Sequence, residues 1–170
     1  LQDIHECLDE TMKHFGLARF SIDTTKSYVG DGIRRLVISA AEEENFKLAV
    51  IYQGLDFNRD PLPVDRIASD FNYFIQNFAS RPAFQLFGKP LVIWSGTWKF
   101  TPQEIARVTT PYRKDLLILA SERNLDGYAR LADLVDGDAY YWSSVNPDTY
   151  PNYEDKLVSL GEAVHKQGGL

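Results

Sequence analysis

The sequence has little cysteine, little basic charge and no long hydrophobic run. Cys7 is the one cysteine among 170 residues, which excludes an intrachain disulfide and a cysteine-based zinc site. Lysine and arginine number 18 against 24 aspartate and glutamate residues, and the net charge of −6 argues against nucleic acid or an anionic membrane as partner. No segment approaches the roughly 18 apolar residues of a membrane span, and the acidic first ten residues do not resemble an export signal. We therefore expect a neutral partner, such as carbohydrate.

Several catalytic and cofactor-binding motifs are also missing. The sequence contains no glycine-rich nucleotide-binding turn, no HExxH zinc motif and no GxSxG nucleophile motif. Its three histidines, His5, His14 and His165, all fall on predicted helices, away from the ends of strands. We therefore expect no metal ion and no organic cofactor.

Apolar runs and helical patterns alternate along the chain. Runs rich in large apolar and β-branched residues predict buried strands, and amphipathic segments between them predict helices. The alternation favours one α/β domain over residues 1–170, with a parallel sheet and right-handed crossovers. The predicted strands are 17–23, 46–53, 90–95, 116–121 and 138–144. The predicted helices are 2–15, 31–44, 64–78, one beginning at Thr101, 125–134 and 150–167.

Two architectures fit this alternation. An open doubly wound parallel sheet suits about five strands in 170 residues, but it normally carries a phosphate-binding glycine-rich turn when it binds nucleotides. A (β/α)8 barrel needs about 250 residues, so this chain would supply only about strands 2–7 of eight. The chain starts on a helix with no strand before it and stops at Gly168-Gly169-Leu170, where a strand is due. We expect an incomplete (β/α)8 barrel and keep the doubly wound sheet as the alternative.

Three segments carry a resemblance to a known family. They are AFQLFGKPLVIWSG at 83–96, NFKLAVIYQGLDF at 45–57 and DGDAYYWSSVNPDTYP at 136–151. Together they resemble the middle of glycoside hydrolases of the family 71 and family 99 type, which are α-1,3-glucanases and endo-α-mannosidase-like enzymes on (β/α)8 barrels. The resemblance covers roughly residues 17–170 and implies an α-linked polysaccharide as substrate. It omits the last part of the barrel, where such proteins tend to carry a Trp-Asn-Glu-type segment.

Glycoside hydrolysis usually needs two carboxylates, one on each side of the scissile bond. Asp23, Asp56 and Glu122 follow predicted strands, and ligands bind at the carboxyl ends of parallel strands, so these three are the candidate catalytic acids. Each also has a structural interpretation. Asp23 suits a turn or a helix cap, Asp56 suits a loop cap, and Glu122 suits an ion pair with Arg123. Asp138 stands at the start of its predicted strand, which places it at the opposite, stabilising edge.

Aromatic side chains cluster at the same predicted strand ends. Tryptophan and tyrosine stack on the apolar face of a sugar ring and offer a polar edge as well. Trp94 and Tyr141 also suit core positions, because alternate residues of a strand point inward, whereas Trp98 lies beyond its strand. The candidate substrate-binding residues are Tyr52, Gln53, Trp94, Trp98, Arg123, Tyr141 and Trp142.

The first hypothesis is therefore a glycoside hydrolase acting on an α-linked glucan or mannan, an enzyme if its parent barrel is complete. A second is a non-catalytic carbohydrate-binding or degenerate barrel fragment. A third is a small open α/β domain of unrelated function. The resemblance implies an extracellular location, although this chain shows no signal peptide. Open edges of an unclosed sheet favour self-association.

Overall fold

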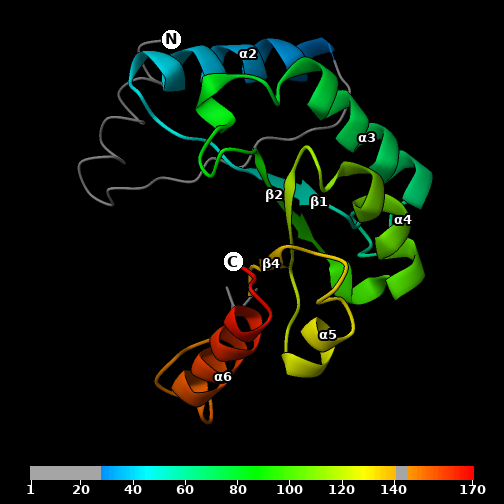
Figure 1. Cartoon of the computed structure of the whole chain (residues 1–170), viewed down its shortest axis with the longest axis vertical. Helices are drawn as coiled ribbons and strands as arrows, with labels where there is room; N and C mark the ends of the chain where they lie inside the picture. The colour runs from blue at the N-terminus through cyan, green and yellow to red at the C-terminus, as the bar shows by residue number, and fades with distance from the viewer. Residues whose placement is uncertain (1–27, 141–144) are drawn as a thin grey trace.

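The computed structural model describes residues 28–140 and 145–170 (Figure 1). The predicted helix 2–15 and strand 17–23, with Asp23, lie outside the described residues. Tyr141 and Trp142 lie outside them as well.

Four parallel strands form one sheet in the described part of the chain. The first three lie within predicted apolar runs, and the order of all four strands in the sheet is their order in the sequence. The strands are β1 (Val50–Gln53), β2 (Leu91–Ser95), β3 (Leu117–Ala120) and β4 (Gly137–Asp138). The last predicted strand is displaced: β4 ends at Asp138, where the prediction began.

The sequential order separates the two architectures. A doubly wound sheet reverses its strand order at a switch point, and these four strands show no reversal. Leu170 extends the order beyond β4, because its N–H donates to the Asp136 carbonyl at 2.9 Å and its carbonyl accepts from the Asp138 N–H at 3.1 Å. This is the pattern of a parallel ladder. The arrangement is that of a barrel wall, and the doubly wound alternative is wrong for the described strands.

Helices alternate with the strands as predicted. Helix α4 begins at a capping box. The Thr101 side chain accepts from the Glu104 N–H, and the Glu104 carboxylate accepts from the Thr101 N–H. Pro102 takes the first helical position. The helices are α2 (Tyr28–Glu43), α3 (Val64–Asn77), α4 (Pro102–Tyr112), α5 (Leu125–Ala129) and α6 (Tyr153–Lys166). Two 3₁₀ turns are η1 (Pro82–Phe84) and η2 (Thr97–Lys99).

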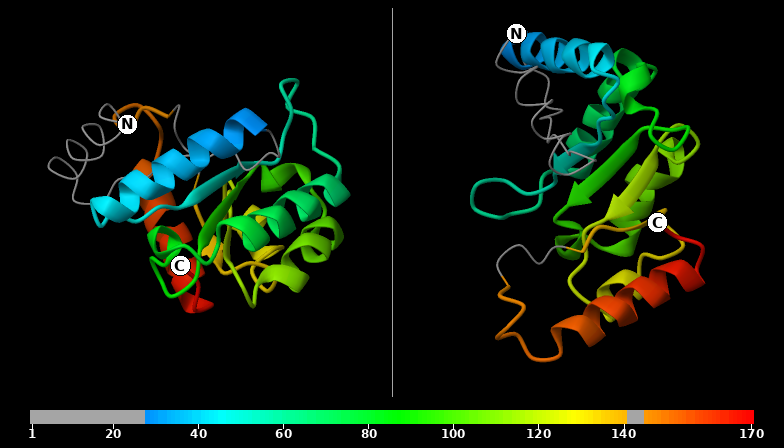
Figure 2. Two further views of the ribbon diagram at one scale, coloured as in Figure 1. Left: turned by 90° about the horizontal axis from the view of Figure 1, so that it is seen from above. Right: turned by 90° about the vertical axis from the view of Figure 1, so that its left-hand side faces the viewer.

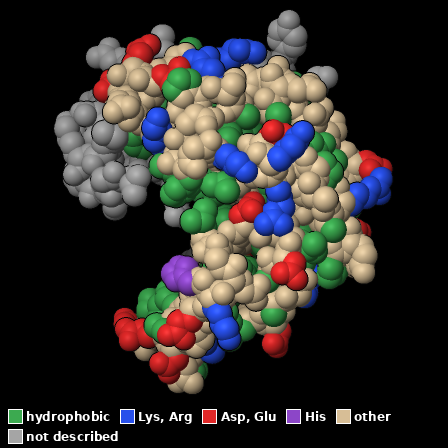
Figure 3. Space-filling view, in the orientation of Figure 1, with side chains coloured by type: hydrophobic (Ala, Val, Ile, Leu, Met, Phe, Trp, Pro, Cys, Tyr) green, Lys and Arg blue, Asp and Glu red, His purple; other side chains and the backbone are tan. Residues whose placement is uncertain are grey.

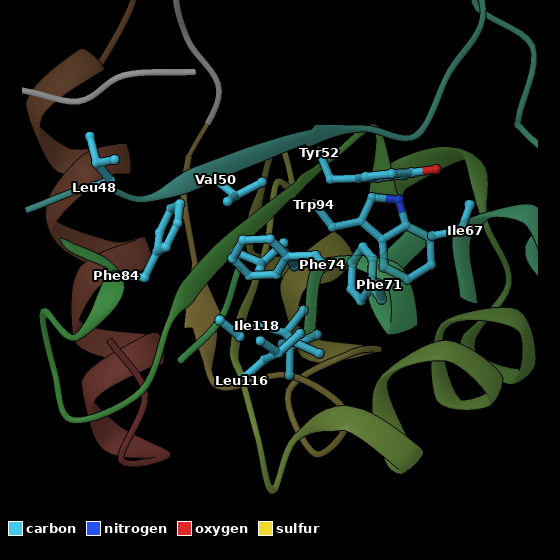
Figure 4. Packing of buried hydrophobic residues seen from close by; sticks show 14 of the residues in the cluster. Leu48, Val50, Tyr52, Ile67, Phe71, Phe74, Phe84, Trp94, Leu116 and Ile118 are labelled. Atoms are coloured by element: carbon cyan, nitrogen blue, oxygen red, sulfur yellow. The ribbon is translucent and has the colours of Figure 1, made fainter. Parts of the chain in front are cut away.

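The helices pack on one face of the sheet, which we call the outer face. Alternate strand residues, among them Tyr52, Trp94 and Ile118, share one hydrophobic core with buried residues of α2, α3, α4 and α6. Figure 4 shows Tyr52 and Trp94 side by side in this core, close to Phe71 of α3. Helices on a single face are expected for the wall of a (β/α)8 barrel.

The other face, which we call the inner face, carries a smaller apolar set. It consists of the remaining strand residues, with Leu91, Ile93 and Leu119 buried and Ile51 and Leu117 half-buried. Figure 3 shows hydrophobic side chains in the hollow between α2 and α6. In a closed barrel this face would line the interior.

Candidate functional site

The carboxyl edge of the sheet gathers most of the predicted site residues that the structure describes. Gln53 ends β1, Trp98 lies in η2 directly after β2, and Glu122 with Arg123 follows β3. The strands are parallel and in register, so these side chains emerge at one edge of the sheet. The structure places Asp56 in the loop that leaves β1 at this edge.

Tyr52 and Trp94 do not belong to the accessible part of this edge. Their side chains lie on the outer face, where the Tyr52 hydroxyl donates to Asp70 Oδ2 of α3 at 2.9 Å. Trp94 is 0% exposed and packs edge-on against Phe71, with ring centroids 6.0 Å apart. Their predicted role in substrate binding is corrected to a core role, which for Trp94 was the alternative interpretation.

The inner face becomes polar at the carboxyl edge. Ile51 pairs with Ile93 on this face. Two residues further along each strand, Gln53 pairs with Ser95, so the same face changes from apolar to polar. The Gln53 residue is exposed, and its amide can both donate and accept hydrogen bonds. Of the strand-end predictions, Gln53 is the one whose position on the inner face suits contact with a ligand.

Trp98 and Arg123 form one composite surface. The guanidinium carbon of Arg123 lies 4.0 Å from the centroid of the Trp98 ring, which is a cation–π contact. Arg123 is exposed and Trp98 is partly exposed, so the pair stands at the surface beyond the ends of β2 and β3. The guanidinium lies over one face of the Trp98 ring, so the pair combines a flat surface with hydrogen-bond donors, which suits a sugar with its apolar faces and its hydroxyls around the edge.

Glu122 occupies a buried position behind that surface. The residue is 2% exposed, and its Oε1 accepts from Arg130 at 2.9 Å. Burial raises the pKa of the Glu122 carboxyl, although a hydrogen bond from Thr97 and the charge of Arg130 act to lower it. The predicted ion pair with Arg123 is replaced by one with Arg130, because Arg123 lies on Trp98. Arg130 also donates to the Phe100 and Thr97 carbonyls, which ties α5 to the loop after β2.

Asp138 lies beside Glu122, contrary to the sequence prediction. It pairs with Ala120 at the carboxyl end of β4, and its Oδ1 accepts from the Glu122 N–H at 2.8 Å. Its Oδ2 is buried and has no hydrogen-bond partner among the described residues. Burial raises the pKa of Asp138 to about 7, and the charge of Glu122 adds to this rise. The prediction failed because it started the strand at Asp138 instead of ending it there.

Asp56 serves its own loop. One carboxylate oxygen, Oδ1, accepts from the Asn58 N–H at 2.8 Å and from the Asp60 N–H at 2.9 Å. These are the contacts of a loop cap, the structural alternative for this residue. A direct role in catalysis stays a prediction for Asp56, as it does for Glu122.

A cavity of about 480 Å³ adjoins the Trp98–Arg123 surface. It opens between the loop after β3 and the start of α6, and because its walls come from segments distant in the chain, no local sequence pattern indicates it. Its lining includes aromatic rings, amides and charges of both signs: Arg123, Asn124, Asp126, Tyr140, Tyr150, Asn152, Asp155 and Lys156. Such a mixture suits a neutral polar ligand better than a charged one.

Two findings bear on cofactors and membranes. Over residues 28–140 and 145–170, no cluster of three or more histidine, cysteine or acidic side chains is arranged to hold a metal ion. Within the same ranges, no helix has both the length and the apolar character to cross a membrane.

Comparison with known proteins finds similarity among solved structures. No protein-family model and no curated protein matches the chain. Among solved structures, the chain resembles the GH99 endo-alpha-mannosidase from Bacteroides thetaiotaomicron, determined in complex with Bis-Tris propane, with a TM-score of 0.71 and 14% sequence identity. The match covers 96% of this chain and 53% of the other. The fold is that of part of a TIM barrel. The resemblance predicted from the sequence is confirmed at the level of the fold, and the chain spans about half the length of the enzyme it resembles.

Proposed function

We propose that this chain forms part of a glycoside hydrolase barrel that acts on an α-linked, mannan-type polysaccharide. The observation that carries the proposal is the similarity of nearly the whole described fold to an endo-alpha-mannosidase barrel. The composite surface of Trp98 and Arg123 supports it, because both side chains stand at the carboxyl edge, where barrel enzymes bind their substrates. The mannosidase neighbour favours mannan over the glucan that the sequence left open.

The proposed chemistry uses carboxylates as acid and as nucleophile or base, without a metal or organic cofactor. Of the predicted acids, Asp56 and Glu122 lie in the described residues at this edge, and Asp138 joins them as a neighbour of Glu122. We infer that Glu122 acts chiefly as a positioning residue. It is buried against Arg130, and the next residue along the chain carries the exposed guanidinium that meets Trp98.

One observation favours a second candidate function, non-catalytic binding of carbohydrate. The carboxylates of Asp56 and Glu122 are both engaged in contacts within the protein, Asp56 with its loop and Glu122 with Arg130. A non-catalytic barrel fragment would keep the Trp98–Arg123 surface and the adjoining cavity, but it would lack two free carboxylates to act as acid and base.

Product analysis separates these candidates. The purified chain is incubated with α-mannan and with α-1,3-glucan, and shortened chains are detected by chromatography beside a no-protein control. Shortened mannan supports the hydrolase, whereas binding of mannan without shortening supports the binding protein. Variants Glu122→Gln and Asp56→Asn are assayed beside the wild type. Activity unaffected by both substitutions would exclude a direct catalytic role for these acids.

A further inference from the structure

The most exposed large apolar side chain among the described residues is Phe57. Its relative exposure is 108%, so its ring touches almost nothing in the protein. It stands in the loop between β1 and α3, which leaves the carboxyl edge of the sheet and projects from the body of the molecule (Figure 2). Single exposed apolar residues are common on protein surfaces. The loop that holds Phe57 distinguishes it from such residues.

Backbone hydrogen bonds close this loop tightly on both sides of Phe57. The Asp56 N–H donates to the Asp60 carbonyl at 2.9 Å, and the Arg59 N–H donates to the Asp56 carbonyl at 3.0 Å. The Asp56 side chain adds its two contacts with the N–H groups of Asn58 and Asp60. Leu55 and Pro61 form an antiparallel bridge just below this turn. The aromatic ring is therefore carried by an ordered turn.

The base of the loop is fixed to the edge of the sheet. The Gly54 N–H donates to the Ser95 carbonyl at 2.9 Å, and the Gly54 carbonyl accepts from the Leu62 N–H at 2.9 Å. Leu55 is buried, and its side chain packs so closely on Gly96 that a Cβ there would lie 2.6 Å from Leu55 Cγ. The backbone that carries Phe57 is thus anchored at the same edge of the sheet that carries Gln53 and Trp98.

We propose that Phe57 is an outlying sugar-stacking residue, which holds a polysaccharide chain at a distance from the Trp98–Arg123 surface. This inference rests on the proposed function. Because hydrogen bonds already order the backbone of this turn, the ring is presented to a sugar face without the entropic cost of ordering a loop. On this account the Asp56 carboxylate organises the turn that presents the ring, which also accounts for its two hydrogen bonds. The ligand is a mannan chain long enough to reach both Trp98 and Phe57.

Affinity electrophoresis tests this role. The full chain and its Phe57→Ala and Phe57→Trp variants are run through gels with and without α-mannan. We expect Phe57→Ala to weaken mannan binding by about fivefold and Phe57→Trp to preserve it. Free mannose competes with mannan for the Trp98 surface. It should therefore displace the alanine variant from mannan more readily than it displaces the wild type. Phe87→Ala is the matched control, because Phe87 is also an exposed phenylalanine but precedes β2, at the amino edge.

The outcomes distinguish this inference from the proposed function. If the wild type binds mannan and Phe57→Ala binds it equally well, Phe57 has no such role and the proposed function stands. If Phe57→Ala and Phe87→Ala weaken binding equally, the effect is general and the inference is also wrong. If the wild type neither binds nor shortens mannan, both the proposed function and the inference fail. Thermal melting of the variants, which we expect to match the wild type, verifies that each variant folds.

Discussion

The guanidinium of Arg123 lies over the ring of Trp98, 4.0 Å from its centroid. These two residues come from different strand ends, and each was selected from the sequence as a substrate-binding residue. The structure joins them into one surface at the carboxyl edge of a barrel wall. Behind that surface, Arg130 and Glu122 tie α5 to the loop after β2.

Removal of Arg130 should destabilise the protein strongly. Arg130→Ala leaves the Glu122 carboxylate, which is 2% exposed, without its cation, and two backbone carbonyls lose a donor. Breaking one partner of a fully buried ion pair typically costs about 3–5 kcal/mol, and because the Arg130 side chain is 30% exposed, we expect a loss toward the lower end of this range. Arg107→Ala is the matched control, since its ion pair with Asp65 is exposed and should contribute less than about 1 kcal/mol. Urea unfolding of both variants measures the difference, and equal losses would contradict the buried network.

Asp138 should make stability depend on pH. Its pKa is raised from 3.8 to about 7 in the folded protein, so between these values the folded state binds more protons than the unfolded state. Its contribution to stability is therefore fully present below about pH 4 and is lost as the pH rises to 7. Asp138→Asn cannot ionise and should show a flatter profile, with a higher melting temperature than the wild type at pH 8. Parallel profiles for the two proteins would show that Asp138 ionises normally.

Two glycines should not tolerate a methyl group: Gly54, which begins the loop between β1 and α3, and Gly96, which follows β2 and packs against that loop. A Cβ at Gly54 would overlap the buried indole nitrogen of Trp94, and Gly96 has a φ of 93° with Leu55 directly against it. We expect alanine at either position to cost about 1–3 kcal/mol through overpacking or backbone strain. Gly161→Ala is the control, because Gly161 lies in α6 with no neighbour within 4 Å of a new Cβ. That substitution should stabilise the protein by about 0.5–1 kcal/mol. Equal thermal shifts in all three variants would contradict the packing described.

Self-association through open sheet edges also stays a prediction. Sedimentation of the isolated chain over a range of concentrations should reveal dimers or larger species, because unpaired strand edges accept further strands. Raising the salt concentration should not dissociate these oligomers if backbone hydrogen bonds between strands hold them together. A single monomeric species at all concentrations would show that the edges are covered.

Sequence patterns predicted the elements well because they depend on local chemistry. Apolar runs located the sheet, and Thr101 with Pro102 marked the start of α4 correctly. The patterns could not tell which face a strand-end residue occupies, since a one-residue shift moves a side chain to the other face. Tyr52 and Trp94 were for that reason assigned to the ligand instead of the core. The shifted start of β4 concealed Asp138 in the same way.

Contacts between distant segments were beyond the sequence for a different reason. The choice of Arg130 over Arg123 as partner of Glu122 depends on how α5 folds back on the sheet. The cavity beside Arg123 depends likewise on where α6 begins, which no local pattern states. The exposure of Phe57 follows from a turn that the aspartate in DFNRD closes through two hydrogen bonds.

Calorimetric titration with α-linked manno-oligosaccharides tests the central claim most directly, namely that the carboxyl edge of this barrel wall binds sugar through Trp98. The wild type should bind, and Trp98→Ala should bind at least about fivefold more weakly while its circular dichroism spectrum shows that it is folded. Equal binding by the two proteins, or no binding by the wild type, would contradict the account.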